Sequence, residues 1–193
     1  MRKIDLDGKR VLEIGPGDIQ HHRFWKGRPS LFAMVDVKQE MLGRSRAKLD
    51  EAGIRHQSVL VSRSDDMLPF DPDSFDVILS FYVLEHIRAL APALDDYSRV
   101  LRPGGVIAGA IPAEGGLAWG GGRFMTSRRW LIKNTHIDPD KIICWEHPNY
   151  AETILSALDA RLERRHLSFW PLVLPSIDLN LVVKFVYRNI KHA

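Results

Sequence analysis

The sequence predicts an α/β fold built on a mostly parallel, doubly wound sheet, and three observations lead to that class. Short apolar runs alternate along the chain with segments of helical periodicity. The first run, Val11–Ile14, leads directly into a turn with glycines at positions 15 and 17. The second run is followed by Asp36, about twenty residues beyond the glycines, where a second strand can hold the ribose of a nucleotide.

Five strands and two connecting helices are expected in the first part of the chain. The helix Gln39–Ala52 carries apolar residues among charges and ends at Gly53, a common helix stop. The helix Ala91–Leu101 has Pro92 near its start and a Pro-Gly-Gly turn after it. The expected strands are Val11–Ile14, Leu31–Val37, Ser58–Val61, Val77–Leu79 and Val106–Ile111.

The segment Pro112–Pro148 has a different character. It contains three consecutive glycines and several aromatic residues but no sustained strand or helix pattern, so it is expected to be an elaborated loop. Within it, Thr126 or Ser127 could cap a short helix through Lys133.

The C-terminal part is expected to form a helix and an antiparallel hairpin. Asn149 followed by Glu152 resembles a capping box that opens a helix to about residue 161. Apolar segments at 167–174 and 179–187 would form the two strands of the hairpin.

Composition sets broad limits on function. A chain of 193 residues with 45% hydrophobic content is expected to form one domain, 1–193. Its net charge of +3 permits an anionic ligand but is too small for a typical nucleic-acid binder. The lone Cys144 has no partner for a disulfide or a CxxC metal site. With no secretory leader or apolar span in view, a cytoplasmic protein is expected.

The glycine turn is the first candidate site. Gly15 and Gly17 permit positive φ and close approach of a ligand, and Glu13 stands where its carboxylate can accept hydrogen bonds from that ligand. The run GPGDIQ lacks the third glycine of a dinucleotide fingerprint, but the spacing to Asp36 supports a nucleotide site. On the alternative interpretation, the glycines only relieve a tight turn, Asp36 is a solvated residue at a strand end, and Glu13 accepts hydrogen bonds from neighbouring backbone.

Four further motifs follow in order: DDMLPF at 65–70, SFDVILS at 74–80, VLEH at 83–86 and LRPGG at 101–105. Together with the glycine turn and Asp36, this series resembles the class I S-adenosylmethionine-dependent methyltransferases over Val11–Ile111, about half of the chain. A nicotinamide dehydrogenase would share the turn and the acid but is not expected to show the later motifs.

The resemblance implies a Rossmann-like, mostly parallel seven-stranded sheet that ends in the antiparallel hairpin. It divides the chain into a cofactor-binding core at about 1–111, an acceptor-side insertion at about 112–148, and a helix and hairpin at about 149–193. S-adenosylmethionine would be the cofactor and S-adenosylhomocysteine the product. The residues expected to hold it are Glu13, Gly15 and Gly17 at the methionine and ribose, Asp36 at the ribose hydroxyls, Asp65 and Asp66 at the adenine, and Ser80 and Phe81 at the methionine.

Methyl transfer is an in-line displacement, so positioning and exclusion of water are the main demands, and no metal is expected. A hydroxyl acceptor would benefit from a histidine that takes its proton. The candidate catalytic residues are His86, which follows the fourth strand, and His147, which could close over the site. His21, His22 and His136 are further candidates, and the VLEH histidine could instead serve packing.

The acceptor pocket is expected to be roofed by Pro112–Pro148, which starts at the carboxyl end of the fifth strand. Its basic residues suggest an anionic acceptor, or else form a solvated basic face. The aromatic residues of this segment are Trp119, Phe124, Trp130 and Trp145, and the basic ones considered are Arg123, Arg128, Arg129 and Lys133.

The run Phe169–Pro175 is unusually apolar for a connector. Burial in the hairpin core is the preferred interpretation, and an interface for a second subunit or a membrane-associated acceptor is the alternative. The chain is expected to be a monomer or a homodimer.

The sequence therefore predicts a methyltransferase that acts on a small or medium-sized acceptor, with oxygen as the first guess for the methylated atom. Sugars, lipid-linked intermediates and natural products all remain open. The alternatives are a non-catalytic cofactor-binding or scaffold protein on the same fold, and a protein or RNA methyltransferase. Nucleobase acceptors are disfavoured, because Ser80–Val83 does not fit the (N/D)PP(Y/F) tetrad common in such enzymes.

Overall fold

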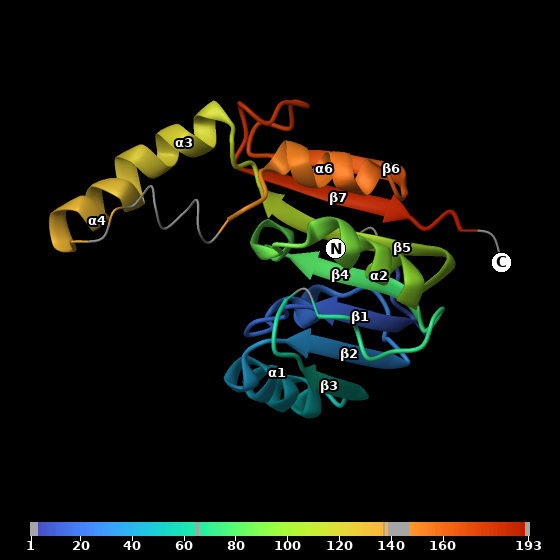
Figure 1. The fold of residues 1–193 in the computed structure, drawn as a ribbon. Coiled ribbons are helices and arrows are strands. Elements are labelled where there is room, and N and C mark those ends of the chain that lie inside the picture. Colours follow the sequence, from blue (N-terminus) through green and yellow to red (C-terminus); the bar gives the residue numbers. More distant parts are fainter. Residues whose placement is uncertain (1–3, 65, 137, 139–146, 192–193) are drawn as a thin grey trace.

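A seven-stranded sheet in the order β3-β2-β1-β4-β5-β7-β6 organises the protein (Figure 1). The computed structural model describes residues 4–64, 66–136, 138 and 147–191. The strands are β1 (Arg10–Ile14), β2 (Leu31–Asp36), β3 (His56–Leu60), β4 (Phe75–Phe81), β5 (Leu101–Pro112), β6 (Glu163–Trp170) and β7 (Val182–Arg188).

The first five strands run parallel, and β7 is antiparallel to both β5 and β6. This confirms the predicted doubly wound, mostly parallel sheet with a C-terminal antiparallel hairpin. The chain moves outward from β1 to β2 and β3, then returns to place β4 on the other side of β1. This reversal creates a switch point between β1 and β4, where open α/β sheets bind their ligands beyond the carboxyl ends of the strands.

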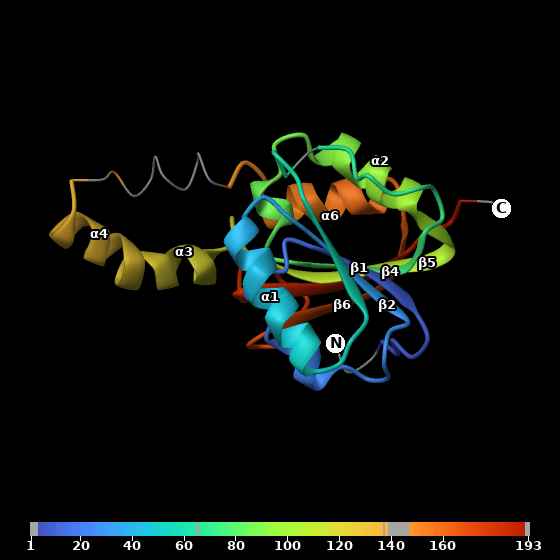
Figure 2. The same ribbon diagram turned by 90° about the horizontal axis from the view of Figure 1, so that it is seen from below.

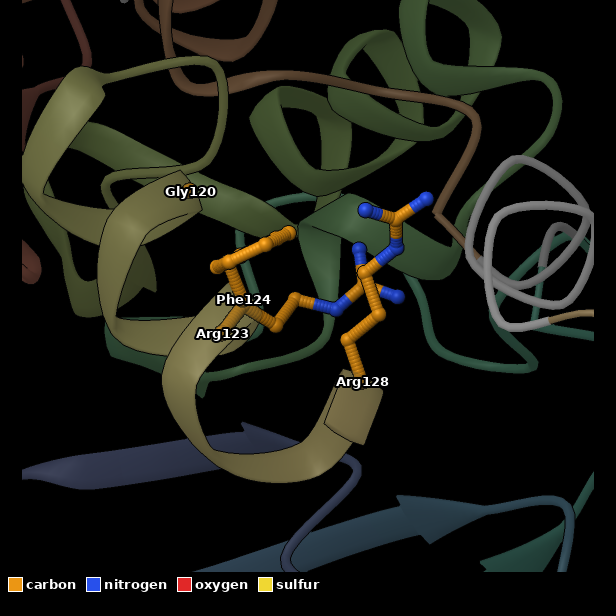
Figure 3. Close-up of a pocket in the computed structure, with 4 residues that line it drawn as sticks. All are labelled: Gly120, Arg123, Phe124 and Arg128. Atoms are coloured by element: carbon orange, nitrogen blue, oxygen red, sulfur yellow. The ribbon is translucent and has the colours of Figure 1, made fainter. Parts of the chain in front are cut away.

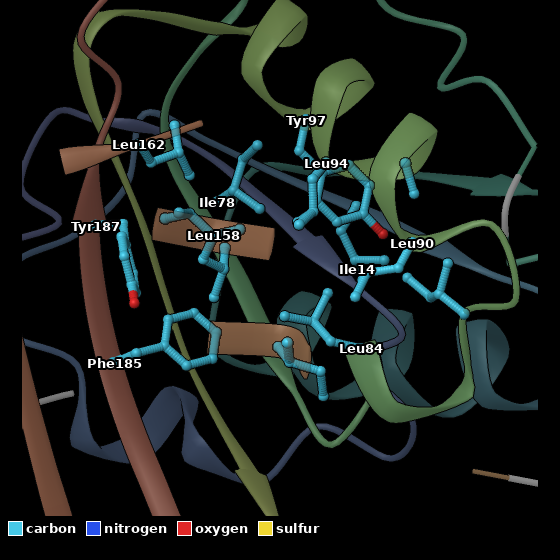
Figure 4. Close-up of a cluster of buried hydrophobic side chains, with 14 of the residues drawn as sticks. Ile14, Ile78, Leu84, Leu90, Leu94, Tyr97, Leu158, Leu162, Phe185 and Tyr187 are labelled. Atoms are coloured by element: carbon cyan, nitrogen blue, oxygen red, sulfur yellow. The ribbon is translucent and has the colours of Figure 1, made fainter. Parts of the chain in front are cut away.

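Helices cover both faces of the sheet (Figure 2). Helix α1 (Gln39–Glu51) lies on one face, while α2 (Leu90–Val100) and α6 (Ala151–Asp159) lie on the other. Figure 4 shows the core beneath α2 and α6, where Leu94 and Leu158 meet side chains of the sheet such as Phe185. Because these helices are fixed by buried apolar contacts, the loops at the carboxyl edge stand on a rigid base.

Residues 117–134 are helical, so the expected elaborated loop is wrong there. The short helix expected through Lys133 is present, but Arg128 occupies its N-cap without a side-chain hydrogen bond, so the cap expected at Thr126 or Ser127 is wrong. Helix α3 (Leu117–Arg123), the π-helical turn η3 (Phe124–Arg128) and α4 (Arg129–Asn134) follow one another as an arm that projects past the carboxyl edge (Figure 1). The three glycines concealed this helix, because each one in a helix costs about 1 kcal/mol relative to alanine. Cys144 and Trp145 lie outside the described residues.

The expected capping box at Asn149 is also wrong. Tyr150 occupies the N-cap of α6, and no side chain caps that helix. The buried Asn149 amide instead donates to the carbonyl oxygens of Leu84 at 3.0 Å and Ile87 at 2.6 Å. Asn149 therefore ties the start of α6 to the 3-10 turn η2 (Leu84–His86).

Burial of the whole run Phe169–Pro175 in the hairpin core is wrong as well. Phe169 packs against the core, but Trp170, Leu172 and Val173 are each more than half exposed. The strand ends at Trp170, and the run continues as the connection to β7. Among the described residues no helix has the length and apolar character needed to cross a membrane.

Candidate active site

The glycine turn at the end of β1 packs against the segment that follows β4. Gly15 has φ +62°, and its N–H donates to the carbonyl oxygen of Val35 at 2.7 Å. A Cβ at this position would lie 2.6 Å from Cγ2 of Val83, which is closer than real side chains approach. Glycine is therefore needed at position 15 for both backbone conformation and space, and its absence of a side chain brings the VLEH segment against the turn.

The second half of the turn is held by β2 and α1. The N–H of Gly17, a residue with φ +56°, lies 3.3 Å from Oδ2 of Asp36. The hydroxyl of Ser45 donates to the carbonyl oxygen of Gly17 at 2.7 Å and accepts from the N–H of Ile19 at 3.1 Å. The other oxygen of Asp36 accepts from the N–H of Lys38 at 2.9 Å. Asp36 is thus brought to the glycine turn, as the sequence predicts.

Glu13 is buried beside the turn and pairs with a histidine. Its Oε1 lies 2.8 Å from Nε2 of His21, in the 3-10 turn η1 (His21–Phe24). The indole N–H of Trp25 donates to Nδ1 of His21 at 2.9 Å. Since an indole can only donate, Nδ1 must accept, and the proton of the ring sits on Nε2 and points at Glu13. Burial raises the pKa of Glu13, and the bond from His21 opposes that rise.

Ser80 and Phe81 end β4 next to this pair. Ser80 lies opposite Ile14 in the pairing of β1 with β4, and it is fully buried. The ring of Phe81 stands 5.2 Å from the ring of His21, measured between centroids. Among the described residues, Oγ of Ser80 and Oε2 of Glu13 have no hydrogen-bond partner.

These groups fit a nucleoside that carries an amino-acid tail. Buried polar atoms without partners are rare in folded proteins and call for an explanation such as a ligand. Glu13 and Ser80 present such atoms on adjacent strands, and Asp36 adds a carboxylate at the end of the next one. A buried carboxylate suits an ammonium group, and an aspartate at the end of β2 suits ribose hydroxyls.

A second polar cluster lies where β5 ends and α6 begins. Nδ1 of His147 lies 2.5 Å from Oε2 of Glu114, which is itself buried two residues beyond β5. The His86 and His147 rings meet edge to face with centroids 4.5 Å apart. The two predicted catalytic histidines, which are distant in sequence, are therefore neighbours in space.

Glu85, which precedes His86, is also buried, as Glu13 and Glu114 are. Burial and repulsion from Glu114 raise its pKa to about 7, against the opposing attraction of His147 and a backbone hydrogen bond. The start of α6 fixes the cluster, because the N–H of Asn149 donates to the Glu85 carbonyl at 3.4 Å and that of Ala151 to the Glu114 carbonyl at 3.2 Å.

The structure assigns other contacts to Asp66 and His22 and does not describe Asp65. Oδ2 of Asp66 accepts from the N–H groups of Ser62 and Arg63, so this oxygen holds its own loop. Asp65 lies outside the described residues. His22 stands edge to face with Trp25, and burial lowers its pKa. In the described ranges, no three or more metal-ligating side chains are grouped to hold a metal ion.

Sequence reasoning missed the partners of the histidines: Trp25, Glu85 and Glu114. Glu85 stood within the VLEH motif, and Glu114 follows the fifth strand, so acids at strand ends were the available signal. Trp25 offered none, because an indole four residues beyond a histidine is usually part of a core.

Comparisons with known proteins identify methyltransferases as relatives. Residues 12–109 match a family model described as a methyltransferase domain. The chain is 33% identical over 102 residues to the ubiquinone/menaquinone biosynthesis C-methyltransferase UbiE of Vibrio vulnificus, covering 51% of this chain and 39% of that protein. It is 26% identical over 104 residues to a phosphatidylethanolamine N-methyltransferase of Cereibacter sphaeroides, covering 54% and 51% respectively. The chain thus spans about half or less of the length of these curated relatives.

A solved structure of similar fold is the N-methyltransferase NodS of Bradyrhizobium japonicum, in complex with S-adenosyl-L-homocysteine. The TM-score is 0.63 at 20% identity, and the match covers 96% of this chain and 80% of that one. At this identity the likeness concerns the fold.

Proposed function

The chain belongs to the class I S-adenosylmethionine-dependent methyltransferases, and we propose that it methylates a hydroxyl oxygen of a small or medium-sized acceptor. Binding of the cofactor is supported by Glu13, Asp36 and Ser80, which lie on neighbouring strands at the switch point between β1 and β4, and the choice of oxygen is supported by the pairing of His147 with Glu114. In this proposal residues 1–111 bind the cofactor, 112–148 face the acceptor, and 149–193 complete the fold.

The residues of the turn would hold S-adenosylmethionine, which supplies a methyl group on a sulfonium whose carbon–sulfur bond breaks with its electron pair leaving on sulfur. Asp36 would accept hydrogen bonds from the ribose hydroxyls. Glu13 would face the ammonium group, with His21 keeping its other oxygen oriented. Ser80 and Phe81 would line the methionine part, while the adenine contacts of Asp65 and Asp66 remain a prediction.

His147 would accept the proton of the acceptor hydroxyl. Because a carboxylate can only accept, Nδ1 of His147 would donate to Oε2 of Glu114, and Nε2 would then be the nitrogen with a lone pair. The hydroxyl oxygen would form the new bond to carbon while its proton passes to Nε2, so the positive charge lost from the sulfonium would appear on the imidazole and the total charge would be unchanged. His86 is the second candidate, because its ring stands against that of His147.

The acceptor would carry an anionic group. The arm contributes four cations at 123–133, and Arg123 and Arg128 line one hollow on it together with Gly120 and Phe124 (Figure 3). Sugars, lipid-linked intermediates and natural products with a phosphate or carboxylate would suit such a surface. One relative is named for phosphatidylethanolamine, a phospholipid. Relatives are named as C- and N-methyltransferases, so oxygen rests on His147 alone.

The first experiment is calorimetry with S-adenosylmethionine and S-adenosylhomocysteine. Wild-type protein should bind both, and Asp36→Ala should lose most of that affinity. Asp71→Ala removes an exposed carboxylate between β3 and β4 and should bind like wild type. Absence of binding by the wild type would contradict the proposal, and binding without consumption by any acceptor would favour the non-catalytic alternative.

The second experiment is an acceptor screen that follows homocysteine released from the product. Hydroxylated phosphates and carboxylates, neutral sugars, proteins and RNA form its separate arms. With an acceptor found, Arg128→Gln/Arg129→Gln should raise the acceptor KM. An unchanged KM would contradict the anionic acceptor, and activity confined to the protein or RNA arm would favour that alternative.

A further inference from the structure

The arm, residues Leu117–Asn134, exposes large apolar side chains where a folded chain normally buries them. It projects beyond the carboxyl edge of the sheet, away from the body of the molecule (Figures 1 and 2). Its large apolar side chains that are more than half exposed are Leu117, Phe124, Met125, Trp130 and Ile132. This concentration of exposed large apolar side chains on one segment indicates a site of interaction.

The hairpin loop, residues Pro171–Leu181, exposes a second apolar group, and its conformation is fixed. The buried side chain of Asn180 accepts from the N–H of Leu172 at 2.9 Å and donates to the carbonyl oxygens of Leu174 at 2.9 Å and Ser176 at 2.8 Å. These bonds hold the loop while Leu172, Val173 and Leu174 point their side chains into solvent. The apolar exposure is therefore built into the loop rather than a result of fraying.

The arm and the hairpin loop meet at the root of the arm. The N–H of Ala118 donates to the carbonyl oxygen of Asp178 at 2.7 Å, and the N–H of Leu117 donates to its side chain at 3.3 Å. A Cβ at Gly116 would lie 2.4 Å from the carbonyl oxygen of Ile177, so the two segments are in close contact there. Their apolar side chains consequently belong to one end of the molecule.

The charge of the arm is of one sign. It contains Arg123, Arg128, Arg129 and Lys133 and no acidic residue. The Arg123 guanidinium stands 5.4 Å from the Trp119 ring, and that of Arg128 stands 5.5 Å from the Phe124 ring. Figure 3 shows both arginines reaching the same hollow. Cations set among aromatic and aliphatic side chains are the composition of segments that lie in the interface of a membrane.

We propose that the arm and the hairpin loop dock the protein on a membrane that contains anionic phospholipids. The apolar side chains enter the interface, and the arginines meet lipid phosphates. A second copy of the chain fits less well, because a twofold contact between two arms would bring like charges together without a carboxylate from either arm. The docking itself does not depend on the proposed methyl transfer. It deepens that proposal by naming membrane phosphate as the anion and presenting the carboxyl edge to a lipid-borne acceptor.

The test is sedimentation of the full chain with two kinds of vesicle, phosphatidylcholine alone and phosphatidylcholine mixed with phosphatidylglycerol. The protein should sediment with the anionic vesicles and stay in solution with the neutral ones. The Arg123→Gln/Arg128→Gln variant should lose about 30-fold in partitioning, since each cation near an anionic surface contributes roughly a factor of five. Trp130→Ser/Leu172→Ser should also weaken binding, because it removes apolar area from both segments.

The control is Arg55→Gln/Arg165→Gln, which removes the same charge from exposed positions outside the arm and the hairpin loop. It should sediment as wild type does. Equal losses in both charge variants would show unspecific attraction and overturn the docking site, as would wild-type protein that ignores anionic vesicles. A dimer in sedimentation equilibrium that Trp130→Ser/Leu172→Ser dissociates, without vesicle binding, would assign the surface to a second copy. Calorimetry with S-adenosylhomocysteine reports separately on the proposed function.

Discussion

Two histidine–carboxylate pairs lie at the carboxyl edge of the sheet, and they differ in which nitrogen faces the acid. Glu13 meets Nε2 of His21, whose Nδ1 accepts from Trp25. Glu114 meets Nδ1 of His147. In the first pair both ring nitrogens are engaged and the proton is already placed, so His21 orients a carboxylate. In the second pair Nε2 is the nitrogen that can accept a proton.

This difference bears on the choice of base. The sequence favoured His86, after the fourth strand, and His147, before the start of a helix, and kept His21, after the glycine turn, as a further candidate. The hydrogen-bond partners separate His21 from His147, because a general base needs a lone pair that can accept the proton of the acceptor. Gly15 and Val83 link the two regions, since the VLEH segment that carries Glu85 packs against the glycine turn.

The largest effect is expected when the second pair loses its base. His147→Asn should lower turnover with an identified hydroxyl acceptor by roughly 10²- to 10⁴-fold, while the affinity for S-adenosylhomocysteine changes little. His21→Asn should mainly weaken the binding of S-adenosylhomocysteine, because His21 orients Glu13. The control, His166→Asn on β6, should behave as wild type in both measurements. Steady-state kinetics and calorimetry check both parts. Similar profiles for His147→Asn and His21→Asn would erase the distinction between the pairs.

The next effect concerns Glu85, a buried carboxyl side chain beside the second pair. Its pKa is raised from 4.5 to about 7, so its contribution to stability is full below pH 4.5 and is lost as pH rises through 7. In Glu85→Gln this loss is absent. The unfolding free energy of the variant relative to wild type should therefore rise by about 3 kcal/mol from acid to alkaline pH.

Urea unfolding at a series of pH values measures that difference. Glu114, His147 and Tyr82 interact electrostatically with Glu85, and burial, followed by the negative charge on Glu85, raises the pKa of Tyr82. Glu13 is also buried and its pKa is also raised. The same urea series on Glu13→Gln therefore measures how much of the pH dependence of the unfolding free energy comes from the first pair. A pH-independent difference between Glu85→Gln and wild type would show that the pKa of Glu85 is the same in the folded and unfolded states, so that burial does not raise it.

The link between the pairs can be broken at one atom. Gly15→Ala places a methyl group 2.6 Å from Val83 at a residue with φ +62°, so it should cost about 2 kcal/mol or more and weaken S-adenosylhomocysteine binding. Gly17→Ala also has positive φ but meets nothing within 4 Å, so it should cost about 1 kcal/mol. Thermal melts of both variants give the comparison. Equal destabilisation would mean that Val83 moves aside freely.

The sequence predicted the parallel strands and the glycine turn because their causes are local. A run of β-branched residues forms a strand wherever it finds a partner strand. Gly15 is required by its own positive φ and by the closeness of Val83. The pairing of Glu114 with His147 was not predictable, since it joins residues 33 positions apart across a segment without a periodic pattern. Asn149 shows the same limit, because its amide serves η2 instead of the local cap its sequence suggests.

The smallest expected effect tests the tautomer on which the comparison rests. Trp25→Phe keeps an aromatic ring on Phe32, where the centroids are now 4.5 Å apart, and removes the indole N–H. It should cost about 1 kcal/mol of unfolding free energy, the usual net value of one hydrogen bond. In side-chain ¹⁵N NMR the wild-type His21 should carry its proton on Nε2 and His147 on Nδ1. In Trp25→Phe the proton of His21 should no longer be confined to Nε2, whereas His147 should keep its proton on Nδ1, because Glu114 still accepts from that nitrogen. A wild-type His21 protonated on Nδ1 would remove the difference between the two pairs, and with it the reason to place the base at His147 alone.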